Sequence, residues 1–158
     1  MSAIVTGPEV IHLEITNTTN YSYILKFTDL LTAFPLVKYI QLSHICTSPS
    51  WMSEILHVKD HGLTCLYIEV QENQIEQLTV EEIVQFLKAQ KKGFELYINL
   101  IPSFGTSEAL DTYFANLKQS FGKLQQGRQD WRGSLVHIRI GLIGFYYYLP
   151  HMQSYLFQ

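Results

Sequence analysis

The sequence lacks the residue patterns on which most catalytic and metal sites depend. Its two cysteines, Cys46 and Cys65, form no Cys-x-x-Cys pair, which argues against a zinc or thioredoxin-type site. His57 and His61 are four residues apart, but no third ligand is adjacent, so we interpret them as histidines at a helix end. No nucleophile elbow and no phosphate-binding loop occur in the sequence. We therefore expect no catalytic residue, no metal site and no cofactor.

Clustered basic residues and long apolar runs are also missing. The chain has 11 Lys and Arg residues against 14 Asp and Glu residues, a formal net charge of −3. This balance does not favour nucleic acid, whose phosphates are bound by clustered cations. The apolar stretch 142–149 is far shorter than the roughly 20 residues of a membrane helix, and residues 1–8 do not resemble a signal peptide. We expect no nucleic-acid partner, no membrane partner, and a cytoplasmic or nuclear rather than secreted protein.

What the sequence does contain is a repeated apolar spacing. Its 158 residues, 47% of them hydrophobic, suit one domain over residues 1–158 with a substantial core. Five short runs share one pattern, an opening residue followed by apolar residues three and five places later. They open at Val10, Val37, Leu63, Gly93 and Leu135, and are therefore 27, 26, 30 and 42 residues apart. One strand-like run at this period is typical of stacked repeat proteins.

Helical patterns separate the strand-like runs. Alternating apolar and polar residues predict five strands with one buried face, whereas 3.6-residue periodicity predicts helices over 24–34, 50–58, 79–92 and 107–124. Thr79 and Glu82 have the spacing of a capping box, and Gly93 suits a left-handed residue at the end of that helix. Residues 143–158, rich in tyrosine and phenylalanine, suit a cap over the end of the stack.

The predicted fold class is α/β, a short strand–helix solenoid with five parallel strands and its helices on one face. Alternating strands and helices require parallel strands, because each helix returns the chain to the same edge. A doubly wound open sheet is the alternative, but its central strands would read as continuous apolar runs. We expect these side chains to face the helices: Leu13, Ile15, Ile40, Leu42, Leu66, Ile68, Leu96, Ile98, Ile138 and Ile140.

The repeated spacing resembles the start of a leucine-rich repeat of the longer strand–helix kind, over roughly residues 8–142. The Asn or Cys that usually follows the strand and binds backbone amides in the turn is out of register, since Thr18, Ile45 and Gln71 occupy its place. Residues 66–70, 78–87 and 94–96 are similar to the repeat-like domains associated with nematode F-box proteins. This resemblance implies a module that recruits substrates within a ubiquitin-ligase system. Only about nine residues lie before the first predicted strand, too few for an F-box, so we do not expect coupling to a ligase to carry over.

These observations predict a non-catalytic module that binds another protein through the exposed face of its sheet. The tyrosines on that face, Tyr39, Tyr67 and Tyr97, should form a nearly continuous aromatic row, and tyrosine is common at binding hot spots. The alternative is a small α/β enzyme or ligand-binding domain using loops at the strand C-termini, near Ser43, His44, Gln71, Glu72, Asn73 and Ser103. The predicted partner-binding residues are His12, Glu14, Tyr39, Gln41, Tyr67, Glu69, Tyr97, Asn99, His137 and Arg139.

Overall fold

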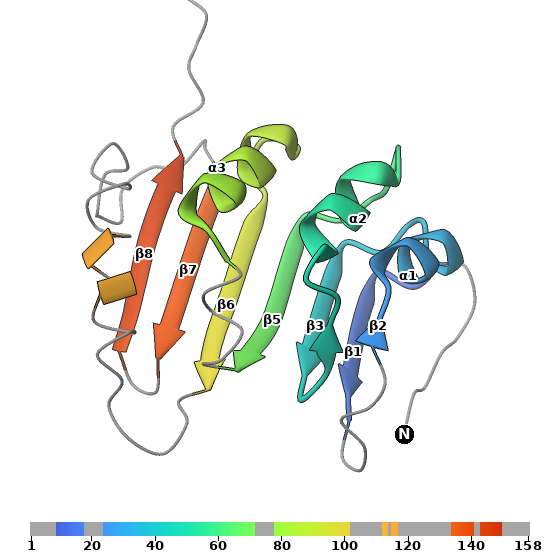
Figure 1. The fold of residues 1–158 in the computed structure, drawn as a ribbon. Coiled ribbons are helices and arrows are strands. Elements are labelled where there is room, and N and C mark those ends of the chain that lie inside the picture. The colour runs from blue at the N-terminus through green and yellow to red at the C-terminus, as the bar shows by residue number, and fades with distance from the viewer. Residues whose placement is uncertain are drawn as a thin grey trace, which may run out of the picture.

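A computed structural model describes residues 9–17, 24–71, 78–101, 112–113, 115–116, 134–140 and 143–149. Six strands form one sheet, and their order across the sheet is their order along the chain (Figure 1). The first five are parallel and the last, β8, runs antiparallel to β7. The strands are β1 (His12–Thr16), β3 (Tyr39–Ser43), β5 (Cys65–Gln71), β6 (Glu95–Ile101), β7 (Ser134–Ile140) and β8 (Ile143–Leu149). The predicted α/β class with a five-stranded parallel sheet is confirmed.

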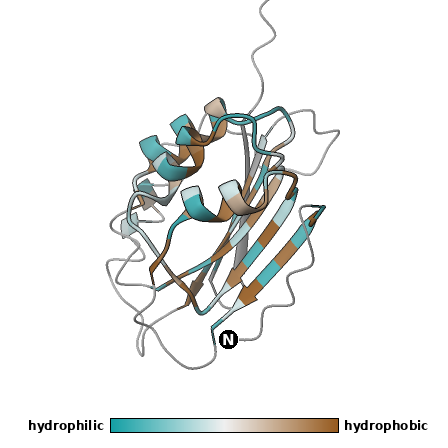
Figure 2. Ribbon diagram, turned by 90° about the vertical axis from the view of Figure 1, so that its right-hand side faces the viewer, coloured by the Kyte–Doolittle hydropathy of each residue, from teal (hydrophilic) through white to brown (hydrophobic). Residues whose placement is uncertain are grey.

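In the described part of the chain, three helices with defined bounds cover one face of this sheet. They are α1 (Phe27–Ala33), α2 (Trp51–His57) and α3 (Val80–Ala89), and all three lie on the same side in two perpendicular views (Figures 1 and 2). α1 contacts α2, and α2 contacts α3, so the helices form a second layer. A second, two-stranded parallel ladder joins β2 (Ile24–Leu25) to β4 (Cys46–Thr47).

The core lies between the sheet and the helices. Burial alternates strictly along β3, β5 and β6, as expected where one strand face meets a helix layer and the other does not. Nine of the ten side chains predicted to face the helices are buried. The structure does not describe the tenth side chain, that of Ile140. Parallel register aligns the buried side chains of the five parallel strands into two aliphatic rows. These rows are Leu13–Ile40–Leu66–Leu96–Val136 and Ile15–Leu42–Ile68–Ile98–Ile138.

Aromatic rings connect the helices to the sheet. Trp51 of α2 lies 6.0 Å from Phe27 of α1 and 5.4 Å from Phe86 of α3, between ring centroids. Phe86 in turn meets Phe94 edge to face at 5.5 Å. All four rings are at most 2% exposed. Each ring contacts the next unit along the chain, so this series ties successive strand–helix units together.

The helix ends show how local sequence sets the boundaries. The predicted capping box is confirmed: the Glu82 amide donates to the Thr79 hydroxyl, and the Thr79 amide donates to the Glu82 carboxylate. Gly93 has the predicted positive φ, 84°, but it lies in the turn before β6, because α3 already ends at Ala89. α1 is capped differently, by the Glu54 carboxylate of α2, which accepts the Phe27 amide at 2.8 Å.

Several predicted boundaries are wrong. The helix predicted over 24–34 begins only at Phe27, because Ile24 pairs with Cys46 in the small ladder and is 56% exposed. The helix predicted over 50–58 forms over Trp51–His57, with Trp51 buried and Leu56 42% exposed. Residues 143–149 form an antiparallel strand that the sequence did not predict, and 150–158 lie outside the described residues. Most of the predicted helix 107–124 also lies outside them, although residues 112, 113, 115 and 116 are helical.

Candidate functional site: the free face of the sheet

The sheet has a second face on which none of the helices α1, α2 and α3 lies (Figure 2). We call it the free face. It carries the residues that alternate with the two aliphatic rows, and parallel sheets are normally covered on both faces. All ten predicted partner-binding residues lie on it, because each belongs to the exposed or half-buried positions of the strands.

Strand register divides the free face into rows of its own. In the first row His12 pairs with Tyr39, Tyr39 with Cys65, and Cys65 with Glu95. The second row runs through these residues: Glu14, Gln41, Tyr67, Tyr97 and His137. The sequence analysis predicted that the three tyrosines form one nearly continuous row. The register shows that they do not share one row. Tyr67 and Tyr97 are direct neighbours, whereas Tyr39 lies one row closer to the strand N-termini.

An open depression of about 530 Å³ lies on this face. Six of the ten predicted residues line it: Tyr39, Tyr67, Tyr97, Asn99, His137 and Arg139. The remaining lining residues are Cys65, Ile98 and Glu95, and none of the three is among the predicted partner-binding residues. His12, Glu14, Gln41 and Glu69 lie on the same face but do not line the depression. The depression therefore spans β3 to β7 and is centred on the tyrosines.

Hydrogen bonds and ring contacts orient two of the three tyrosines that line the depression, Tyr39 and Tyr97. The Tyr39 hydroxyl donates to Gln41 Oε1 at 2.9 Å, and its ring lies 4.3 Å from that of His12. The Tyr97 hydroxyl donates to Glu95 Oε2 at 3.0 Å, while its ring meets His137 edge to face at 5.5 Å. Because each ring is held at both ends, little side-chain entropy remains to be lost when a ligand binds.

Burial is the main cause of the pKa shifts of four side chains that line the depression. It raises the pKa of the Cys65 thiol to about 12, with a further contribution from the nearby Glu95 carboxylate. Burial is also the main reason why the pKa of Tyr39 and that of Tyr67 are raised. His137 is shifted in the opposite sense: burial, and then Arg139, lower its pKa. At neutral pH the thiol and the two tyrosines are therefore neutral, and the thiol is a poor nucleophile.

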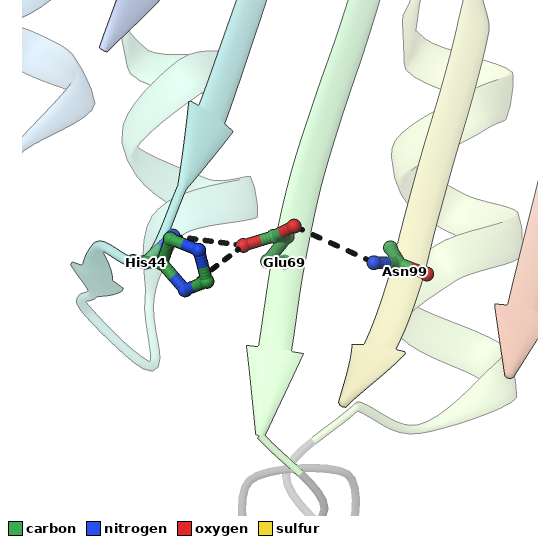
Figure 3. A network of polar contacts seen from close by, with 3 residues as sticks. All are labelled: His44, Glu69 and Asn99. Carbon is green, nitrogen blue, oxygen red and sulfur yellow. Dashed lines mark hydrogen bonds and ion pairs between the residues drawn. The ribbon is translucent and has the colours of Figure 1, made fainter. Parts of the chain in front are cut away.

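Glu69 has a structural role that the sequence did not reveal (Figure 3). Its Oε2 accepts the backbone amide of His44 at 2.8 Å and lies 3.6 Å from the imidazole Nδ1 of the same residue. Its Oε1 accepts a long hydrogen bond of 3.5 Å from Asn99 Nδ2. His44 follows the last residue of β3 and has a left-handed φ of 57°. Glu69 thus satisfies the amide of the residue that follows β3.

The other candidate positions give no catalytic or metal geometry within the described residues. Ser43 and His44 lie at the end of β3 and Gln71 at the end of β5, whereas Glu72, Asn73 and Ser103 lie outside the described residues. His57 ends α2 and its Nδ1 lies 2.6 Å from the Ser53 carbonyl; His61 follows the helix rather than sharing its face. In the described ranges, no group of three His, Cys, Asp or Glu residues could hold a metal ion.

Helices that could cross a membrane are likewise not found among the residues that the structure describes. Comparisons of the whole chain with protein-family models, with curated proteins and with solved structures return no match.

Proposed function

We propose that this protein is a non-catalytic binding module that recognises another protein through the free face of its sheet. The observation that carries the proposal is the tyrosine-lined depression on a sheet face that α1, α2 and α3 leave uncovered. A parallel sheet with one such face exposes backbone and half-buried side chains that are ordinarily covered. A bound partner would provide that cover.

The chemistry of the depression supports a protein partner. Tyr39, Tyr67 and Tyr97 combine apolar ring area with hydroxyl groups, a combination enriched in binding hot spots. Around them lie amide and charged groups, including Asn99 and Arg139, which suit the polar rim of an interface. The thiol of Cys65, whose pKa is raised to about 12, is unsuited to nucleophilic catalysis, and this favours binding over chemistry at this position.

We also propose that the strand–helix units form a short leucine-rich-repeat-like solenoid. One backbone pattern supports this: the Ile11 carbonyl accepts amides of Lys38 and Tyr39, and the Lys38 carbonyl accepts those of Thr64 and Cys65. The Thr64 carbonyl then accepts the Glu95 amide. Recurrence of one contact between successive units is expected of stacked repeats. A role in recruiting substrates to a ubiquitin ligase stays a hypothesis drawn from the resemblance, and co-purification of ligase subunits with the protein would test it.

The proposal can be tested by site-specific photocrosslinking in cells that express the protein. A photoreactive phenylalanine analogue replaces Tyr67 in the depression or, as a control, the exposed Gln85 on α3. We expect a discrete crosslinked protein from position 67 that is missing from position 85. If both positions crosslink the same proteins, or if position 67 crosslinks none, the free face is not the binding surface.

A further inference from the structure

We propose that the depression on the free face receives a cationic side chain, a lysine or arginine of the partner, seated between the tyrosine rings and next to Glu95. This inference rests on the proposed function and names the chemistry of its central contact. It excludes an acidic or purely aliphatic anchor.

The rings supply the first part of such a site. Tyr67 and Tyr97 are register partners on adjacent strands, and Tyr39 lies one row away on the next strand, so three rings line one depression. The π faces of aromatic rings attract cations within about 6 Å, and the attraction grows when the ion is withdrawn from water. The half-buried tyrosines provide such partial withdrawal.

A carboxylate supplies the second part. The Tyr97 hydroxyl donates a hydrogen bond to Glu95 Oε2 at 3.0 Å. Within the described part of the chain, the other oxygen of this carboxylate, Oε1, has no hydrogen-bond partner. An ammonium or guanidinium over the Tyr97 ring could therefore also donate to Glu95 Oε1. The same carboxylate contributes to the raised pKa of the Cys65 thiol, a sign that its negative charge acts inside the depression.

The charge of the surrounding face agrees with a cationic ligand. The described strand positions of the free face carry three carboxylates, Glu14, Glu69 and Glu95, against one guanidinium, Arg139. With neutral histidines, the formal charge of these four groups is therefore −2. Arg139 lines the depression four residues further along the strands than the Glu95 row, because Glu95 pairs with Leu135 and Asn99 pairs with Arg139. This separation keeps the guanidinium away from the Glu95 side of the depression, where the cation is placed.

NMR titration with three short peptides tests the assignment. The probes are acetyl-Gly-Lys-Gly-amide, its trimethyl-lysine form and its norleucine form, the last isosteric in its stem but uncharged. We expect saturable shifts of the Tyr67 and Tyr97 amides with both cationic peptides, and binding at least about threefold weaker with norleucine. Glu95→Gln and Tyr97→Leu should each weaken the lysine peptide at least about threefold, while Tyr97→Phe should weaken it less because the ring remains.

The control is Glu81→Gln, which neutralises an exposed carboxylate on α3, on the other side of the sheet. Equal binding of the norleucine and lysine peptides overturns the cation assignment, as does an equal effect of Glu95→Gln and Glu81→Gln. The proposed function is judged separately, by the protein that crosslinks to position 67. If position 67 crosslinks a protein but the lysine and norleucine peptides bind equally, only the cation assignment is overturned. If the lysine peptide binds more tightly but position 67 crosslinks no protein, the cation site stands and the protein partner is overturned.

Discussion

The two faces of the sheet are built from the same strands but carry different kinds of order. On the helix-covered face, strand register places one branched aliphatic residue beside another, as in the row from Leu13 to Val136. On the free face, neighbouring positions change chemistry from strand to strand, from Glu14 to Gln41 to Tyr67. Burial alone explains the first face, because any aliphatic residue of suitable volume can fill it. The specific polar and aromatic contacts of the free face need a different explanation, which the proposed recognition of a partner would supply.

The largest difference between the faces should appear in stability. Leu66→Ala and Ile98→Ala each empty a fully buried position and should lower the free energy of unfolding by about 2–5 kcal/mol. Tyr67→Ala, next to Leu66 on the same strand but on the free face, should cost no more than about 1 kcal/mol, the range of cross-strand pair contacts. Urea unfolding of the three variants measures this contrast. Equal losses for Leu66→Ala and Tyr67→Ala would mean that the faces are assigned wrongly.

Glu69 should be the free-face residue on which stability depends. Glu69→Ala removes the acceptor of the His44 amide and should cost about 1–2 kcal/mol, typical of hydrogen bonds to a charged group. Glu14→Ala, which removes an exposed carboxylate from the same face, should stay within about 0.5 kcal/mol of the wild type. The comparison uses urea unfolding at neutral pH. If the two variants are equally stable, the carboxylate does not support the turn.

The capping box should have a smaller effect. Thr79→Ala removes the hydroxyl that accepts the Glu82 amide and should lower the free energy of unfolding by about 1 kcal/mol. The control is Thr32→Ala in α1, where an exposed hydroxyl donates to the Thr28 carbonyl inside the helix, and it should be nearly neutral. Thermal melts of both variants, followed by circular dichroism, provide the measurement. Equal melting temperatures would show that α3 does not need its cap.

The smallest expected effect depends on pH. Burial, followed by the charge of Lys91, lowers the pKa of His61 from its usual 6.5, and its Nδ1 is buried without a hydrogen-bond partner. The unfolded chain therefore takes up this proton at a higher pH than the folded chain does. Stability should be fully present above about pH 7 and decline as the pH falls through the lowered pKa. His61→Gln should reduce the decline in the urea midpoint between pH 7.5 and 5.5; an unchanged decline would exclude His61 as its source.

The sequence predicted the helix-covered face well, because apolar and polar residues alternate along each parallel strand and this alternation shows which side chains are buried. The alternation around Leu66 and Leu96 placed both residues correctly, and Thr79 with Glu82 located the start of α3. The two-residue strands β2 and β4 could not be predicted, since such short segments show no period. β8 contains the continuous run Phe145 to Leu149, which carries no alternation from which a strand could be recognised.

The arrangement of the free face was harder to predict, since it depends on register between strands. Tyr39 lies two residues after the opening residue of its unit, whereas Tyr67 and Tyr97 lie four residues after theirs, and this offset separates the rows. In β7, Leu135 pairs with Glu95 rather than with Gly93, which brings His137 beside Tyr97. Glu69 was assigned to partner binding alone, because nothing in the linear sequence connects it to the His44 amide, 25 positions away.

The most direct test of a binding role for the free face is the dissociation constant of the protein that crosslinks at position 67. It should be measured for the wild type, for Tyr67→Ala/Tyr97→Ala, and for Glu81→Ala/Gln85→Ala, which changes two exposed residues on α3. All three proteins must first show a cooperative thermal melt that begins well above the temperature of the binding measurement. We predict that the tyrosine double variant binds at least about 30-fold more weakly, as expected when hot-spot side chains are removed, while the α3 variant binds like the wild type. Unchanged affinity in the tyrosine double variant would contradict the account.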